Sequence, residues 1–103
     1  MTTARKVRGR TSELLVAQYL AEHGFPGAHA VSSGATGADI KGVPFSIEVK
    51  ARRGFEPKAW LEQAEKRPGL SLVIFRMNGQ GPASIESWGS LMRFGTTVEL
   101  LPK

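Results

Sequence analysis

The chain of 103 residues contains no cysteine, which excludes a disulfide framework and a zinc site built from thiolates. It has no apolar run near the roughly 20 residues that a membrane-spanning helix needs. The basic N-terminal segment is not followed by the apolar core of a signal peptide, because Glu13 and Gln18 interrupt the sequence there. We therefore expect a cytoplasmic protein.

Acidic residues are scarce relative to basic ones. The 9 Asp and Glu residues stand against 14 Lys and Arg, which gives a net charge of +5. The basic residues cluster within residues 5–10 and 50–53, and such clusters indicate a polyanionic partner such as DNA. The alternative is a small basic protein that binds no polyanion. The length and the hydrophobic content of 41% predict one domain, residues 1–103. The basic residues near its start define a basic arm over residues 1–8.

Hydrophobic periodicity and turn residues divide the chain into helices and strands. Helices are predicted over residues 8–23, 57–66 and 90–94. Strands are predicted over residues 28–33, 38–41, 45–52, 70–77, 83–88 and 97–101. The second and third strands join across a short turn as a hairpin. The order αβββαββ, extended by the short helix and an edge strand, describes an α/β fold in which helices flank a mixed central sheet.

The second strand of the hairpin alternates strictly between apolar and polar residues. The polar side chains share one face and are Ser46, Glu48, Lys50 and Arg52. A two-residue register across the turn would place Asp39 beside Glu48. Adjacent carboxylates destabilise a sheet, but Mg²⁺, which takes one or two carboxylates, reverses that effect. Lys50 would then orient the attacking water or stabilise developing negative charge. A solvated sheet face is the alternative explanation.

Glu13 lies on the apolar stripe of the first predicted helix, which Leu14, Ala17 and Leu20 define. An acid that faces the core side of a helix requires a partner. One interpretation is an i, i+3 salt bridge with Arg10. The other is that Glu13 faces the hairpin and joins the metal site.

Three motifs carry a resemblance to a known family. They are Gly9-Arg10-x-x-Glu13, Gly37-Ala38-Asp39-Ile40 and Ile47-Glu48-Val49-Lys50. In this order they resemble the PD-(D/E)xK nuclease superfamily, and within it the small Holliday junction resolvases of archaeal type and their phage relatives. Ala38 stands where that motif has proline. The resemblance implies a restriction-endonuclease-like core, a role in DNA recombination and repair, and a prokaryotic or phage-infected cell.

The resemblance also implies roles for individual residues. Asp39 and Glu48 would bind Mg²⁺, or Mn²⁺ in its place, with the Val49 carbonyl and Glu13 completing the site, and Lys50 would act on the water. Ser33, or Ser32, would lie near the scissile phosphate, although a plain loop serine is the alternative. Gln63 would be an accessory residue, with a solvated helix position as the alternative. The predicted DNA-binding residues are Arg5, Lys6, Arg8, Arg10, Ser33, Arg52 and Arg53.

We therefore expect a Mg²⁺-dependent, structure-selective DNA endonuclease that acts on four-way junctions. Two symmetric cuts would require a C2 homodimer. A candidate interface patch, which could equally close the core, consists of Trp88, Leu91, Met92 and Phe94. The alternatives are a flap-cutting, nicking or RecB-like exonuclease of the same superfamily, and a basic DNA-binding module without catalysis.

Overall fold

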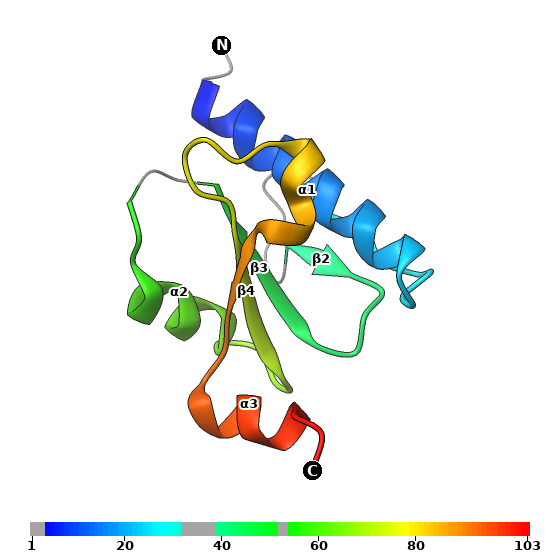
Figure 1. The fold of residues 1–103 in the computed structure, drawn as a ribbon, viewed down its shortest axis with the longest axis vertical. Coiled ribbons are helices and arrows are strands. Elements are labelled where there is room, and N and C mark those ends of the chain that lie inside the picture. Colours follow the sequence, from blue (N-terminus) through cyan, green and yellow to red (C-terminus); the bar gives the residue numbers. More distant parts are fainter. Residues whose placement is uncertain (1–3, 32–38, 52–53) are drawn as a thin grey trace.

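A five-stranded mixed sheet organises the chain in a computed structural model that describes residues 4–31, 39–51 and 54–103 (Figure 1). The helices are α1 (Ala4–Glu22), α2 (Pro57–Ala64), the 3₁₀ helix η1 (Pro82–Ser87) and α3 (Phe94–Leu100). The strands are β1 (His29–Ala30), β2 (Ile40–Lys41), β3 (Ser46–Lys50), β4 (Ser71–Phe75) and β5 (Gly89–Leu91). The predicted α/β class with a mixed sheet is confirmed.

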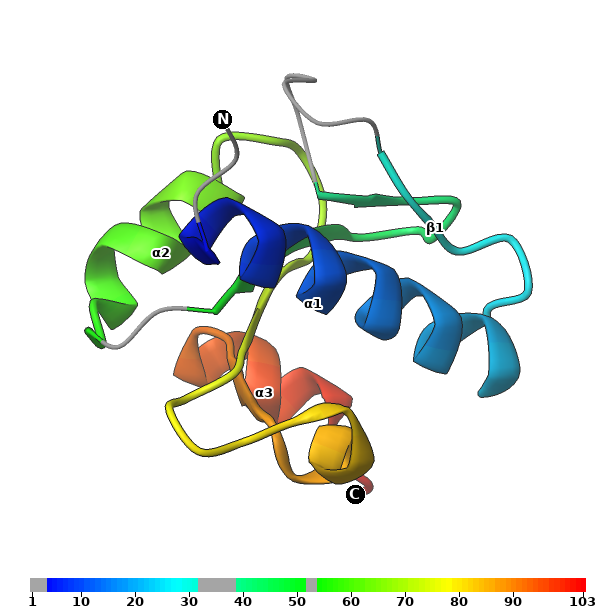
Figure 2. The ribbon, with the colours of Figure 1, turned by 90° about the horizontal axis from the view of Figure 1, so that it is seen from above.

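The strands follow one another across the sheet in the order of the sequence. β3 and β4 are parallel and are joined through α2, whereas the other neighbouring pairs are antiparallel. Seen from above, α2 lies on one side of the molecule and β1 on the other, with α1 crossing in front of the sheet (Figure 2). Among the described residues, no helix combines the length and the apolar character that a membrane span requires.

The hairpin of β2 and β3 forms as predicted, with Ile40 opposite Ile47. Gly42 in its turn has φ +81°, a backbone conformation that glycine adopts without strain. A Cβ atom on Gly42 would lie 1.9 Å from the carbonyl oxygen of Gly27. The turn therefore packs directly against the loop before β1, and this close approach excludes a side chain at position 42.

Two apolar clusters form the core. In the first, Val16 and Ala17 of α1 pack with Ile40, Ile47, Val49 and Trp88. In the second, Trp60, Leu61 and Ala64 of α2 pack with Val73 of β4. Because side chains alternate along a strand, β3 directs Ile47 and Val49 toward α1 and its polar residues toward α2. The predicted stripe of α1 is wrong at Leu14, which is 49% exposed, since Val16 takes the packed position.

Of residues 83–88, predicted as a strand, residues 83–87 lie in the 3₁₀ helix η1 instead. Pro82 lies in its first turn, and the Gly81 N–H donates a hydrogen bond to Ser84 Oγ at 3.1 Å. Proline fixes φ at a helical value and has no N–H to donate to a strand ladder. Ile85 and Trp88 still pack against the core, and these apolar residues are the ones that suggested a strand.

The helix predicted over residues 90–94 and the strand predicted over residues 97–101 are also wrong. The structure has the strand β5 first and the helix α3 second. Gly89 in β5 stands opposite Phe75 of β4. A Cβ atom on Gly89 would lie 2.1 Å from Cζ of the Phe75 ring, so the ring covers the glycine. This contact allows a glycine-containing segment to form the edge strand, although glycine weakens strands in general. Residues 97–101, predicted as that strand, lie largely in α3.

Candidate active site

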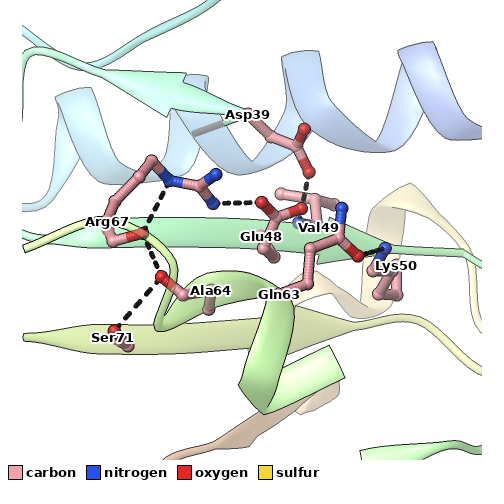
Figure 3. Close-up of polar contacts among 9 residues, drawn as sticks. Asp39, Glu48, Val49, Lys50, Gln63, Ala64, Arg67 and Ser71 are labelled. Carbon is pink, nitrogen blue, oxygen red and sulfur yellow. Dashed lines mark hydrogen bonds and ion pairs between the residues drawn. The ribbon is translucent and has the colours of Figure 1, made fainter. Parts of the chain in front are cut away.

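The polar face of β3 is buried. The exposed fractions of Ser46, Glu48 and Lys50 are 4%, 2% and 8%. Each of the three makes a polar contact to α2 or to the segment that follows it (Figure 3). A solvated sheet face therefore does not explain the alternation in β3. The strand carries ionisable groups at positions where a parallel central strand normally carries apolar ones.

Asp39 lies directly before β2 and points toward Glu48 and Val49 (Figure 3). Its backbone N–H donates to the Ile47 carbonyl at 3.0 Å, and its Oδ2 accepts the Val49 N–H at 2.7 Å. The pKa of Glu48 is raised, first by burial and then by the negative charge of Asp39. The predicted proximity of these two carboxylates is thus present in the structure.

Arg67 holds the buried carboxylate of Glu48 in an ion pair. Its Nε also donates to Ser46 Oγ at 3.0 Å, and that hydroxyl donates to the Ala64 carbonyl at 2.9 Å. The positive charge of Arg67 opposes the rise in the pKa of Glu48. A carboxylate at this depth requires such a partner, since an unpaired buried charge is strongly destabilising.

Lys50 lies at the end of β3, and its Nζ donates to Gln63 Oε1 on α2 at 2.6 Å. Gln63 is itself exposed, but its amide oxygen reaches inward to the ammonium group. The predicted accessory residue therefore lies beside the predicted catalytic lysine. The contact fixes the direction of the Lys50 ammonium next to the carboxylate pair.

Glu13 of α1 has one cationic partner and is influenced by two like charges. Its Oε2 lies 4.0 Å from Nη1 of Arg10, and the same Arg10 nitrogen donates to the Val31 carbonyl. Burial raises the pKa of Glu13, as do the charges of Asp39 and Glu48, while Arg10 lowers it. Glu13 thus combines the predicted salt bridge with a place in the electrostatic field of the hairpin carboxylates.

The carboxylates offer a donor set suited to a hard divalent cation. Mg²⁺ in proteins binds one or two carboxylates and keeps several waters, so Asp39 and Glu48 would suffice. Burial and then the charge of Asp39 raise the pKa of Glu48, and a cation bound between the two carboxylates would relieve their repulsion. Within residues 4–31, 39–51 and 54–103, no group of three His, Cys, Asp or Glu side chains has the arrangement of a metal site. Glu13 as a third ligand stays a prediction.

The other predicted residues are distributed as follows. Ser32, Ser33, Arg52 and Arg53 lie outside the described residues. Arg5 and Lys6 belong to the first turns of α1, which begins before the predicted residue 8. Of the candidate interface patch, Trp88 packs in the core and Phe94 is 82% exposed.

Sequence reasoning missed Arg67. The residue follows α2 directly, before Pro68 and Gly69, and its sequence position carries no periodic signal that links it to Glu48. The two residues are 19 positions apart, and the α2 crossover brings them together. A buried acid does require a cationic partner, so a search among the basic residues near the ends of neighbouring elements would have included it.

The chain was compared with protein-family models, with curated proteins and with solved structures, and nothing matched in any of the three. A function must therefore be argued from the side chains that the fold brings together. Those are the paired carboxylates, the lysine beside them and the arginine that balances them.

Proposed function

We propose that this protein is a Mg²⁺-dependent endonuclease that hydrolyses phosphodiester bonds in branched DNA, with a four-way junction as its substrate. The observation that carries the proposal is the burial of Glu48 and Lys50 on one face of β3, with Asp39 against Glu48. Burying these groups is costly for a purely structural strand, whereas clusters of perturbed ionisable groups are typical of active sites. The mixed sheet and the hairpin position of Asp39 support a restriction-endonuclease-like core.

In this proposal each residue has a chemical role. Asp39 and Glu48, with the Val49 carbonyl, hold the cation, and a bound Mg²⁺ supplies Lewis-acid polarisation of the scissile phosphate. Lys50 directs its ammonium group at the negative charge that develops as the bond breaks, and Gln63 keeps that group in place. Arg67 balances the negative charge of the carboxylate pair before the cation binds.

The charge of the chain supports a polyanionic substrate, since the net charge is +5. The charged groups of the candidate site, Asp39, Glu48, Lys50 and Arg67, suit contacts with phosphate rather than with bases. We therefore expect the protein to select DNA by shape. Cutting a junction symmetrically requires two active sites, which a C2 homodimer would supply. Phe94, which is 82% exposed, is a candidate contact in that dimer.

The proposal is tested by cleavage of synthetic four-way junctions, flaps and linear duplexes, with Mg²⁺ and with EDTA. We expect junction cleavage in Mg²⁺ and none in EDTA, and Asp39→Asn should abolish cleavage while DNA binding is kept or strengthened. Preferred cutting of flaps or of duplex ends would indicate another nuclease of the same superfamily. Binding without cleavage of any substrate would indicate a non-catalytic DNA-binding module.

A further inference from the structure

Two arginines, Arg8 and Arg76, lie together on the α1 side of the sheet, and neither forms an ion pair within the part of the chain that the structure describes. Arg76 follows β4 directly, and its Nη1 donates to Ser12 Oγ of α1 at 3.2 Å. Arg8 precedes Ser12 by one helical turn, and its carbonyl accepts the Ser12 hydroxyl at 2.7 Å. Ser12 is completely buried, so it fixes Arg76 relative to Arg8. The guanidinium of Arg76 also lies over the Trp88 ring, 5.3 Å from its centroid.

The two guanidinium groups repel each other. The pKa of Arg76 is lowered, first by burial and then by the charge of Arg8. Among the described residues no carboxylate forms an ion pair with either arginine. The remaining segments, residues 1–3, 32–38 and 52–53, contain no Asp or Glu, so the side chains of this chain offer no further acid to them.

Arg76 Nε donates to the Gln80 carbonyl at 2.7 Å, but the hydrogen bonding of Arg8 is incomplete. One of its terminal nitrogens donates to the Met77 carbonyl at 3.3 Å, but its buried Nε has no hydrogen-bond partner among the described residues. Arg93 provides the contrast within the same chain, because both of its donating nitrogens lie 2.8 Å from the Glu65 carboxylate. Two close cations without an acid are unfavourable alone and become favourable when an anion binds between them.

The cluster is placed near the candidate active site. The backbone N–H of Arg76 donates to the Lys50 carbonyl at 2.8 Å, so Arg76 and Lys50 lie at the same end of the sheet. Ser12 directly precedes Glu13 in α1. The Lys50 side chain faces α2 and the Arg76 side chain faces α1, so a DNA backbone that presents one phosphate to Lys50 would reach Arg8 and Arg76 by passing over this end of the sheet.

We propose that Arg8 and Arg76 form a second phosphate-binding site, which holds a non-scissile backbone phosphate of the DNA substrate, with Ser12 as a positioning residue. The inference rests on the proposed function in that the phosphate belongs to DNA. Arginine suits this task because its planar guanidinium binds phosphate oxygens in a bidentate manner.

The first experiment uses inorganic phosphate alone and so does not depend on nuclease activity. Thermal melts of the full chain are recorded in phosphate and in chloride at equal ionic strength. Phosphate should stabilise the wild type, since a ligand that binds the folded state raises its melting temperature. Arg8→Gln and Arg76→Gln should lose this stabilisation, whereas Arg93→Gln, a matched control, should keep it. Equal stabilisation of all four proteins would overturn the site.

The second experiment is a salt titration of binding to a four-way junction, with Ca²⁺ in place of Mg²⁺ to prevent cutting. Each phosphate contact that is lost makes the slope of log K against log salt shallower by about 0.9. We expect this change for Arg8→Gln and Arg76→Gln, no change for Arg93→Gln, and a retained slope for Arg76→Lys, which keeps the charge. Arg76→Lys and Arg8→Gln carry the comparison if Arg76→Gln does not fold.

The outcomes separate this inference from the proposed function. A wild type that binds and cuts the junction, with unchanged salt slopes in Arg8→Gln and Arg76→Gln, overturns the second site and leaves the nuclease intact. A wild type that binds no DNA overturns the nuclease and the assignment of the bound phosphate to DNA. Loss of cleavage in Arg93→Gln as well would contradict a local role for Arg8 and Arg76.

Discussion

The two faces of β3 are buried to a similar degree by opposite means. On the face toward α1, Ile47 and Val49 pack against apolar side chains. On the face toward α2, Ser46, Glu48 and Lys50 are held by hydrogen bonds and one ion pair. One strand of five residues thus contains an apolar core surface and a polar network, and α1 and α2 cover one face each.

The two faces differ in what their burial contributes to stability. Burying apolar area stabilises the folded state directly. Burying ionisable groups is favourable only when their partners offset the lost hydration, and apolar side chains of similar volume are often as stable or more stable there. The face of β3 toward α1 therefore stabilises the fold directly, and the cost of the polar face toward α2 is what the proposed function would explain.

The largest expected effect is on catalysis. Lys50→Ala should lower the single-turnover rate of junction cleavage by on the order of 10²–10³-fold, as loss of a comparable electrostatic donor does in other enzymes. Ile47→Val, on the opposite face of the same strand, should lower the free energy of unfolding by about 0.5–1.5 kcal/mol and leave the cleavage rate of the folded protein unchanged. If Ile47→Val slowed cleavage as much as Lys50→Ala, the division between the two faces would be wrong.

The next effect is on stability. Arg67→Met should lower the free energy of unfolding by about 2–3 kcal/mol, less than the roughly 3–5 kcal/mol of a fully buried pair because Arg67 is 23% exposed. The physical reason is that Glu48 would lose its cationic partner in the interior and would either remain charged there or have to take up a proton. Urea denaturation in EDTA measures the change. Adding Glu48→Gln to Arg67→Met should restore part of the loss, and an Arg67→Met protein as stable as the wild type would contradict the role of the pair.

A smaller, pH-dependent effect is expected for Glu13. Its pKa is raised above the ordinary value of 4.5 in the folded state, so the folded protein binds this proton more tightly than the unfolded chain does. The resulting stability is present below pH 4.5 and is lost as the pH rises through the raised pKa. Glu13→Gln should remove this loss, so its melting temperature should exceed that of the wild type increasingly across that window.

Glu65 supplies the control with the opposite sign. Its pKa is lowered from 4.5, chiefly by its hydrogen bond with Arg93. Glu65→Gln should therefore lose stability at neutral pH, and the difference from the wild type should vanish as the pH falls through the lowered pKa. Melts of both variants in EDTA from acidic to neutral pH make the comparison. Parallel curves for Glu13→Gln and the wild type would contradict the electrostatic link to the hairpin.

The smallest effect is expected for the exposed ion pair of Arg93 and Glu65. Arg93→Gln should lower the free energy of unfolding only slightly and less than Arg67→Met does, because solvent screens the pair and both side chains lose freedom when they meet. The pair has two hydrogen bonds of 2.8 Å, so its geometry is good and its exposure is what limits its contribution. Urea denaturation of Arg93→Gln and Arg67→Met under the same conditions compares the two losses of stability. Equal losses would remove the distinction between buried and exposed ion pairs.

The sequence predicts the hairpin and its neighbours well because their signals are local. Strict alternation in β3 and the turn at Gly42 define the pairing of Ile40 with Ile47, and that pairing brings Asp39 to Glu48. The continuous apolar run around Val73 predicts a buried strand, and β4 forms there. Pro57 marks the start of α2. In each case one segment contains the information that decides its own structure.

The parts that could not be predicted depend on contacts between distant segments. Gly89 becomes part of a strand because the Phe75 ring covers it, and nothing in the local sequence shows this. Arg67 becomes the partner of Glu48 because α2 carries the chain back across the sheet. Arg76 and Arg8 lie far apart in the sequence and meet through Ser12. The roles of Asp39, Glu48 and Lys50 in catalysis stay predictions.

The parallel pairing of β3 with β4 has a consequence for the order of events in folding. The β2–β3 hairpin is a local structure that can close early, whereas the parallel pair must wait for the α2 crossover, and such non-local pairings form slowly. The two carboxylates would then meet before Arg67 arrives to neutralise them. We expect the chain to cross its folding barrier with this repulsion partly uncompensated, so that acid, which removes the repulsion, should speed folding of the hairpin.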